Sequence, residues 1–314
     1  MIVDLPDTTV SRIARSLVSV REEGGAVALG RVLTLVIATR SGLEENAIEA
    51  ANDASREHPM RVIVLMTDPE GEPRLDAQIR VGGDAGASEV IVLRAHGDAA
   101  SNEESLVTGL LLPDAPVVVW WPDSPPEHPA DSALGRIAQR RITDAATRPF
   151  AGGRLSLLAG AYEPGDTDLA WTRLTHWREQ LAAVLDQPPF DPVVDVAVEG
   201  AGSSPSTGLL AAWLRLKLDV PVDWSYSDPA DWNHGIRSVR LTRASGDIVL
   251  KRHDDTVATL TQPGQPEHEI VLPRRTLREC LAEELRRLDP DLLYGRVISA
   301  GWSLLDPPKA SGAV

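Results

Sequence analysis

Short apolar runs rich in β-branched residues alternate with helical patterns through the first half of the chain, and this alternation restricts the fold more than any other feature. Apolar runs of this length, bounded by turn residues, are typical of strands that are buried on both faces. Strands that alternate with helices favour a largely parallel sheet with helices on its faces. The expected strands are Leu29–Ala38, Arg61–Met66, Leu75–Val81, Glu89–Leu93 and Pro116–Trp121, and the expected helices are Leu43–Arg56 and Glu103–Leu111.

The second half begins in the same way and then changes character. Val193–Val198 is an expected strand, a loop of small residues follows it, and a helix is expected from Ser206 to Lys217. The next runs mix apolar and polar residues at roughly alternate positions, which predicts an antiparallel meander with one solvent-exposed face. These runs are Ser238–Thr242, Ile248–Lys251 and Thr256–Thr261, and helices expected at Thr276–Arg287 and Asp291–Ser299 follow them.

The proline-containing stretch Asp186–Asp191 is the best boundary between domains, because proline interrupts both helices and strands. We therefore expect an α/β fold of two domains. The N-terminal domain, residues 1–188, has a mostly parallel sheet with flanking helices and includes a helix over 167–186. The second α/β domain, residues 189–306, contains the antiparallel meander, and residues 307–314 are expected to be a flexible tail.

The charge balance argues against two classes of partner. The 314 residues carry 31 basic and 46 acidic side chains, a formal net charge of −15, whereas nucleic-acid binding needs a basic face. The sequence has no run of about 18 apolar residues that could span a bilayer, and its first residues do not resemble a secretory signal. We therefore expect a cytoplasmic protein that binds neither nucleic acid nor membrane.

Motifs for catalysis, metals and cofactors are missing from the sequence. The seven histidines have no metal-ligand spacing, and there is no Gly-x-Ser-x-Gly elbow for a serine hydrolase. The loop Gly200–Pro205 stands between an expected strand and helix, but a dinucleotide fingerprint requires glycine at 205 and a Walker A loop requires lysine. The loop is interpreted as a turn with a helix cap. The alternative is anion binding at the helix N-terminus by Ser206 and Thr207.

The segment Gly165–Arg178 is unusual, because it combines two tryptophans, two arginines and two aspartates in a chain with only eight tryptophans. Helical spacing places Trp177 on an apolar stripe, so we interpret it as a core residue. Trp171 lies at the edge of that stripe, and Arg173 points away from it. Because tryptophan and arginine dominate interface hot spots, Trp171, Arg173 and Arg178 are candidate partner-binding residues. A solvated helix face is the alternative for Arg173.

Similar reasoning applies to other tryptophans and arginines and to the cysteine. Side chains alternate along a strand, so one of Trp120 and Trp121 is expected to be exposed, and Trp121 is the next candidate partner contact. The pairs Arg140–Arg141 and Arg274–Arg275 are interpreted as surface salt-bridge partners, with a sugar-phosphate clamp as the alternative. The single cysteine, Cys280, is expected to be buried and inert.

Several stretches of the chain resemble one known family in the same order along the sequence. The segment GDTDLAWTRLTHWR at 165–178 resembles the signature helix of the OpcA-type glucose-6-phosphate dehydrogenase assembly proteins of actinobacteria. The N-terminal residues 1–37, the central residues 111–145 and the C-terminal residues 272–291 are also similar to that family. The cyanobacterial branch is associated with cysteine-based redox control, which a single cysteine cannot form within one chain.

The resemblance implies a non-catalytic assembly factor and allosteric activator of glucose-6-phosphate dehydrogenase in the oxidative pentose phosphate pathway. The implied partner is that dehydrogenase, and no cofactor or metal is implied. The alternative is an enzyme or sensor that binds a sugar phosphate or nucleotide in a strand-end crevice, using arginines and the loop 200–206. A scaffold without effect on activity is a third possibility.

Overall fold

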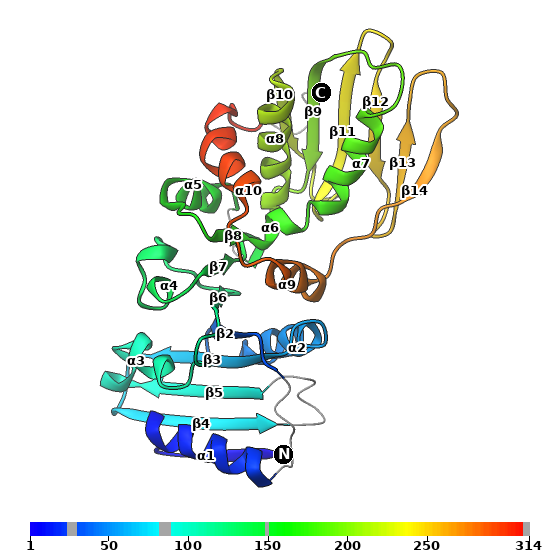
Figure 1. The fold of residues 1–314 in the computed structure, drawn as a ribbon. Helices are drawn as coiled ribbons and strands as arrows, with labels where there is room; N and C mark the ends of the chain where they lie inside the picture. The colour runs from blue at the N-terminus through cyan, green and yellow to red at the C-terminus, as the bar shows by residue number, and fades with distance from the viewer. Residues whose placement is uncertain (24–29, 82–88, 148–150, 310–314) are drawn as a thin grey trace. The chain divides into compact units, whose positions relative to one another are not determined.

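The structure is a computed structural model, and it describes residues 1–23, 30–81, 89–147 and 151–309. Packing divides the chain into two compact units, and each unit is assembled from separate stretches of sequence (Figure 1). The first unit consists of Met1–Asp144, Glu163–Thr167 and Leu277–Pro290, and the second consists of Ala145–Tyr162, Asp168–Thr276 and Asp291–Val314.

This division differs from the boundary expected at residue 188. Residues 168–188 pack with the second unit, because Trp177 and Leu181 are buried in its apolar core. Residues 307–309, the described part of the expected flexible tail, also differ from the expectation. Lys309 donates its backbone N–H to the carbonyl of Trp224 over 2.8 Å, so the described part of this segment is attached to the second unit. Residues 310–314 lie outside the described residues.

The first unit is built on an eight-stranded sheet with the order β1-β4-β5-β3-β2-β6-β7-β8. The strands from β5 to β7 in that order pair in parallel, while β4 pairs antiparallel with both β1 and β5. The strands are β1 (Ile2–Leu5), β2 (Leu33–Ala38), β3 (Met60–Asp68), β4 (Arg74–Val81), β5 (Glu89–His96), β6 (Val117–Trp121), β7 (Arg140–Thr143) and β8 (Asp166–Asp168). The mostly parallel sheet expected from the sequence is therefore confirmed.

Helices lie on this sheet where apolar side chains recur at helical spacing. Ile13 and Leu17 of α1 share one apolar cluster with Leu106 and Val107 of α3. Helix α2 packs against α9, in which Cys280 is fully buried as expected. The helices of this unit are α1 (Val10–Glu23), α2 (Glu44–Ala54), α3 (Glu103–Thr108), α4 (Ala133–Arg136) and α9 (Leu277–Arg286).

The expectation that one of the two adjacent tryptophans is exposed is wrong. Trp120 is 0% exposed and Trp121 is 4% exposed. All five residues of their strand β6 are buried, as in a parallel strand whose two faces are both covered. Trp121 is therefore a core residue of the first unit.

The expectation of a surface arginine pair at 140–141 is also wrong in its placement. Both arginines are buried, and both form ion pairs within the first unit. Arg140 pairs with Glu284 of α9, and Arg141 pairs with Asp166 of β8. Asp166, one of the acidic residues of the segment 165–178, therefore holds a buried guanidinium group in place.

The second unit contains a six-stranded sheet with the order β10-β9-β11-β12-β13-β14. β9 pairs in parallel with β10, and the remaining pairs are antiparallel, which confirms the meander. Residues of the meander alternate between buried and open positions, as Leu250 and Lys251 illustrate. The strands are β9 (Val193–Gly200), β10 (Val222–Tyr226), β11 (Ile236–Arg243), β12 (Ile248–Arg252), β13 (Val257–Thr261) and β14 (His268–Val271).

Helices α7 and α8 share one apolar cluster with the buried face of this sheet (Figure 1). α8 connects β9 to β10, and its first ten residues are all buried. Residues 152–160 lie in a helix, α5. The helices of this unit are α5 (Ala151–Ala161), α6 (Leu169–Thr172), α7 (Thr175–Leu185), α8 (Pro205–Leu218) and α10 (Leu292–Arg296), and α10 continues into a π-helical turn at Val297–Gly301.

Candidate functional site

The segment 165–178 forms a strand and two short helices instead of one continuous helix. Asp168 ends β8, and its side chain accepts a hydrogen bond from the backbone N–H of Ala170 over 2.9 Å, which caps α6. α6 ends after one turn at Arg173, and α7 begins at Thr175. Two helices therefore replace the single expected one, and all four residues of α6 are buried.

Trp171 is buried as a result, with 1% of its surface exposed. Its indole N–H donates to Asp291 over 2.8 Å, and its ring lies against that of Tyr294 at 5.9 Å between centroids. The Arg178 guanidinium group lies 3.8 Å from the ring centroid, a cation–π contact. The expectation of an edge position for Trp171 is therefore wrong, because Trp171 lies in α6, whose four residues are all buried. Trp171 instead positions Arg178.

Several strands of the second sheet end at the same edge, near Arg173. β9 and β12 both run antiparallel to β11, so they run in the same direction, and β14 runs in that direction too. The carboxyl ends of β9, β12 and β14 therefore meet at one edge of the sheet. The N-terminus of α8 lies at this edge as well, because α8 follows β9 after a short loop.

A cavity of about 280 Å³ lies at this edge, within the second unit. Its wall takes residues from the α6–α7 junction, the start of α8, the end of β12 and the segments beside β11 and β14. Among the residues that the structure describes, the lining has no aspartate or glutamate. The polar and charged side chains that line it are Arg173, Ser203, Ser204, Ser206, Asn233, His234, Arg252, Arg274 and Arg275.

Arg252 is the most unusual of these side chains, because it ends a strand on the buried face of the sheet. It follows Ile248 and Leu250 at alternate positions and is only 5% exposed. Its Nη2 donates to the carbonyl of Leu272 over 2.6 Å, and its guanidinium lies 5.2 Å from the Trp177 ring centroid. Burial, and after it repulsion from Arg274, lowers the pKa of Arg252 to about 10.

Two neighbouring arginines are held at the cavity by backbone carbonyl groups. Arg274 donates to the carbonyl of His234 over 2.6 Å and also pairs with Asp255. Arg275 donates to the carbonyl of Thr172 over 2.9 Å. Arg274 is therefore a salt-bridge partner, as expected, and both arginines of the pair also line the cavity.

The loop between β9 and α8 is shaped by packing as well as by the cavity. A side chain at Gly200 would lie 2.7 Å from the carbonyl oxygen of Gly235 and would also collide with Thr207, so only glycine fits there. Thr207 is fully buried in α8, and it does not line the cavity. Of the two candidate anion-binding residues at the start of α8, only Ser206 is therefore placed at the cavity.

The first unit has a switch point in its strand order, and polar side chains of the unit pair with one another beside it. β2 pairs with β3 on one side and β6 on the other, so the strand order changes direction there, and open α/β sheets bind ligands at such a point. Asp123, just after β6, accepts from Thr39 over 2.8 Å and from Arg40 over 2.6 Å. Burial alone would raise the pKa of Asp123, but these hydrogen bonds, with one from Ser124, lower it.

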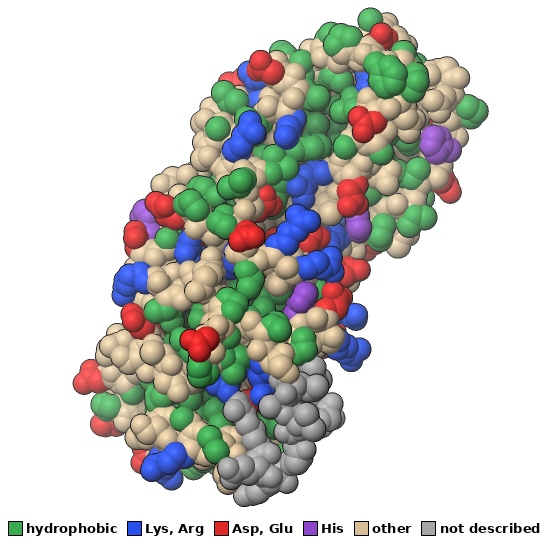
Figure 2. Space-filling view, viewed as in Figure 1, with side chains coloured by type: hydrophobic (Ala, Val, Ile, Leu, Met, Phe, Trp, Pro, Cys, Tyr) green, Lys and Arg blue, Asp and Glu red, His purple; other side chains and the backbone are tan. Residues whose placement is uncertain are grey.

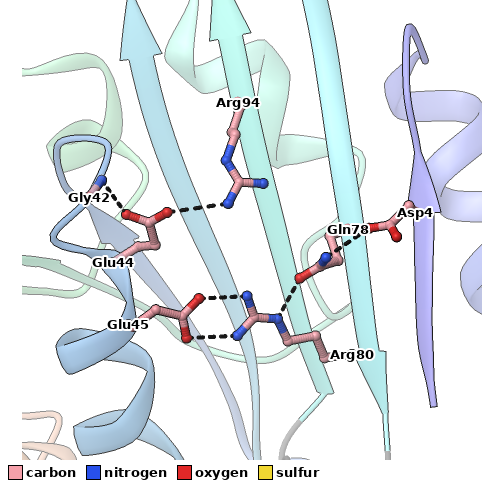
Figure 3. A network of polar contacts seen from close by, with 7 residues as sticks. All are labelled: Asp4, Gly42, Glu44, Glu45, Gln78, Arg80 and Arg94. Carbon is pink, nitrogen blue, oxygen red and sulfur yellow. Dashed lines mark hydrogen bonds and ion pairs between the residues drawn. The ribbon is translucent and has the colours of Figure 1, made fainter.

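The start of α2, where a dinucleotide pyrophosphate would sit, is occupied by carboxylates (Figure 3). Glu44 accepts the backbone N–H of Gly42 over 2.6 Å and pairs with Arg94 at 3.2 Å. Glu45 receives two hydrogen bonds from Arg80, of 2.9 and 2.7 Å. Two negative groups at this position disfavour a phosphate ligand in the first unit.

The structure adds two general observations. Among the described residues, no group of three or more His, Cys, Asp and Glu side chains could hold a metal ion, and no helix is both long and apolar enough to cross a membrane. On the face shown in Figure 2, acidic and basic side chains are interspersed. A cavity whose described lining has four arginines and no carboxylate is therefore a local departure from an acidic composition.

Sequence reasoning missed Arg252 and the carboxylates beside the switch point of the first unit. A signal for Arg252 was present, since it follows Ile248 and Leu250 at the next alternate position, one residue beyond the expected strand Ile248–Lys251. The roles of Asp123 and Glu44 follow from the order of strands in the sheet, which the sequence alone does not supply. The structure brings Arg173 to the cavity wall and Arg178 onto Trp171, whereas Trp121 belongs to the core of the other unit.

Comparison with known proteins identifies the class. Residues 51–159 match a family model for the N-terminal domain of a glucose-6-phosphate dehydrogenase subunit, and residues 164–298 match the model for the C-terminal domain of that subunit. The two matches place the protein in the class of glucose-6-phosphate dehydrogenase subunits. The chain belongs to the OpcA family, as the resemblance of residues 165–178 implied.

A curated relative and two solved structures are also similar. The "Putative OxPP cycle protein OpcA" of Synechocystis sp. is 26% identical over 193 residues, which is 56% of this chain, and the match spans only 41% of the relative. An oxidoreductase from Sinorhizobium meliloti has a TM-score of 0.45 at 12% identity, over 86% of this chain and 95% of that one. A putative oxidoreductase from Magnetospirillum magnetotacticum has a TM-score of 0.41 at 13% identity, over 85% and 97%. At these TM-scores the structural similarity carries no functional argument.

Proposed function

We propose that this chain is a non-catalytic assembly factor and allosteric activator of glucose-6-phosphate dehydrogenase. The observation that carries the proposal is the match of both family models, which together cover most of residues 51–298. The first unit supports it, because Asp123 and the carboxylates at the start of α2 place negative charge beside the switch point of its sheet. A dehydrogenase of this fold would need that point for its dinucleotide.

Activation requires that the protein bind the active conformation of the dehydrogenase more tightly than the inactive one. A preference of about 1–3 kcal/mol changes the apparent affinity for substrate by roughly 5–150-fold. No catalytic group of this chain takes part in such a mechanism. The protein on its own is therefore expected to oxidise no glucose 6-phosphate with NADP.

Within this proposal, the dehydrogenase contacts the segment 165–178 through Arg173 and Arg178. Both side chains are partly exposed, whereas Trp171 is buried and acts by holding Arg178 over its ring. Arginine supported by an aromatic ring is pre-organised, so less conformational entropy is lost on binding. Trp121 takes part only by supporting the first unit, because it is buried in that core.

Co-purification with the host's dehydrogenase tests the proposal, followed by kinetics with and without this protein. The expected result is a complex of fixed stoichiometry with a lower KM or a higher kcat that saturates at that ratio. Binding without any change in rate would replace activation by a scaffold function. Failure to bind the dehydrogenase under any condition would reject the proposal.

A matched pair of variants locates the contact. Arg178→Ala should weaken activation about tenfold or more, as truncation of a hot-spot residue does. Arg240→Ala is the control, because Arg240 is an exposed arginine on the open face of the meander, where it pairs with Asp247. Equal activation by both variants would remove Arg178 from the interface.

A further inference from the structure

We propose that the arginine-lined cavity of the second unit binds the phosphate group of a small phosphorylated metabolite. The proposal goes beyond the assembly function and does not depend on it. The anion would lie between the N-terminus of α8 and the guanidinium groups of Arg173, Arg252, Arg274 and Arg275.

Arg252 is the observation that points to a ligand. The side chain is nine-tenths buried and lines the cavity, and its Nε makes no hydrogen bond. Its contacts are a carbonyl group and an aromatic ring, and among the described residues no carboxylate lies within ion-pair distance of it. Asp254 and Asp255 act on this guanidinium group only from beyond ion-pair distance. A buried guanidinium group without an ion-pair partner is costly, and an anion in the cavity would supply that partner.

The start of α8 provides a second, independent feature. This helix has 14 residues, and its N-cap residue Ser204 makes no side-chain capping hydrogen bond. Pro205 occupies the first turn, and Ser206 beside it lines the cavity. The partial positive charge of an uncapped N-terminus favours an anion, and it acts here in the same direction as the arginines.

The number of cations and the size of the cavity select the class of ligand. Guanidinium groups match phosphate oxygens bidentately, and a phosphate monoester carries close to two negative charges at neutral pH. The volume of about 280 Å³ lies just below the range of roughly 300–1,000 Å³ for sites of drug-sized ligands. A compact phosphate ester fits this space better than a dinucleotide. Ser203 and Asn233 in the wall can bond to its hydroxyl groups.

Isothermal titration of the full-length protein with three probes tests the proposal. The probes are inorganic phosphate, glucose 6-phosphate and glucose, each at the same ionic strength. We expect saturable 1:1 binding of the two phosphates and none of glucose. Tighter binding of the ester than of inorganic phosphate would show that the cavity also recognises the sugar.

Three variants assign the binding to this cavity. Arg252→Met removes the buried charge, and Arg173→Gln changes a partly exposed residue at the rim, so that at least one of the two folds normally. Each should weaken phosphate binding about tenfold or more, because each removes a charge-assisted hydrogen bond. Arg240→Gln, on the open face of the sheet, should bind phosphate as the natural chain does.

Two outcomes would overturn the proposal. The first is that neither phosphate binds, or that both bind equally well to the natural chain and to the folded Arg252→Met and Arg173→Gln variants. The second is that phosphate does not bind while Arg252→Met weakens association with the dehydrogenase. That result would mean that the cavity receives an acidic side chain of the partner protein. Activation by a chain that binds no phosphate would leave the proposed assembly function intact.

Discussion

The chain contains two similar arrangements, in which a buried parallel strand is followed by a loop and a helix, and they differ in the charge around the helix N-terminus. In the first unit, Glu44 and Glu45 begin α2, and they bind Arg94 and Arg80 (Figure 3). In the second unit, α8 begins without a side-chain cap beside four arginines. Two helix starts in similar positions are therefore surrounded by groups of opposite charge.

Trp177→Ala should have the largest effect, because it removes the aromatic wall of the arginine-lined cavity and part of the core. Trp177 is 2% exposed and lies in the apolar cluster of the second unit. We expect a loss of about 3–5 kcal/mol in the free energy of unfolding, measured by urea denaturation. Trp232→Ala is the control, since that ring is only partly buried beneath Arg274. Equal losses in both variants would mean that Trp177 is not a core residue.

Arg252→Met should stabilise the protein in the absence of phosphate, by about 1–3 kcal/mol. Burial and the neighbouring Arg274 lower the pKa of Arg252 to about 10, so the folded state disfavours its charged form. That cost is fully present below pH 10 and is relieved as the pH rises through the folded pKa. Thermal unfolding at pH 7 and pH 10.5 checks this: the advantage of the variant should shrink at the higher pH. A variant less stable than the natural chain at pH 7 would show that Arg252 is compensated within the fold.

Glu44→Gln addresses the start of α2 in the first unit and should cost about 1 kcal/mol at pH 7. Burial opposes ionisation of Glu44, but backbone N–H groups and Arg94 outweigh it and lower the pKa of this carboxyl group. Its contribution is therefore present above the ordinary pKa of a glutamate and is lost as the pH falls through the lower folded value. The difference in unfolding free energy between the natural chain and the Glu44→Gln variant, measured in urea, should disappear as the pH falls from about 5 to about 3. This range follows from the ordinary pKa of a glutamate. Glu45→Gln is the matched control, with a more exposed side chain and a smaller expected effect.

Arg173→Gln should have the smallest effect on stability, within about 0.5 kcal/mol, because the side chain is only partly buried at the rim of the arginine-lined cavity. The variant separates ligand binding from folding. Its melting temperature should match that of the natural chain without phosphate and fall below it when phosphate is present. An equal rise with phosphate in both proteins would place the anion away from Arg173.

The sequence predicted the elements that depend on local pattern. β-branched runs such as Arg61–Met66 became strands, and the alternation through Ile248 and Leu250 became the meander. Patterns failed where the expected helix is interrupted: Asp168 caps α6, this helix ends after one turn, and Trp171 lies in that buried turn. They also failed for Trp121, since the coverage of both faces of a strand depends on what packs over the sheet.

The sequence predicted less of the candidate site than of the fold. Ser206 and the pair at 274–275 are possible anion contacts from sequence alone, but nothing local joins them to Arg252 or Arg173. These residues come together because β9, β12 and β14 end at the same edge of one sheet. The order of strands determines this placement, and it depends on contacts between residues that are far apart in the chain.

The interleaved course of the chain has a consequence for synthesis on the ribosome. The first unit needs α9, whose residues follow Thr276, and cannot be completed from its N-terminal stretch of 144 residues alone. At about 5–20 residues per second, the ribosome needs roughly 7–30 s to add the chain between Asp144 and Pro290. During this interval the surface of α2 that α9 covers is open, and a nascent chain in this state is a substrate for chaperones. A gene fragment ending near residue 160, where the two family models meet, would lack α9, and the surface of α2 that α9 covers would stay open.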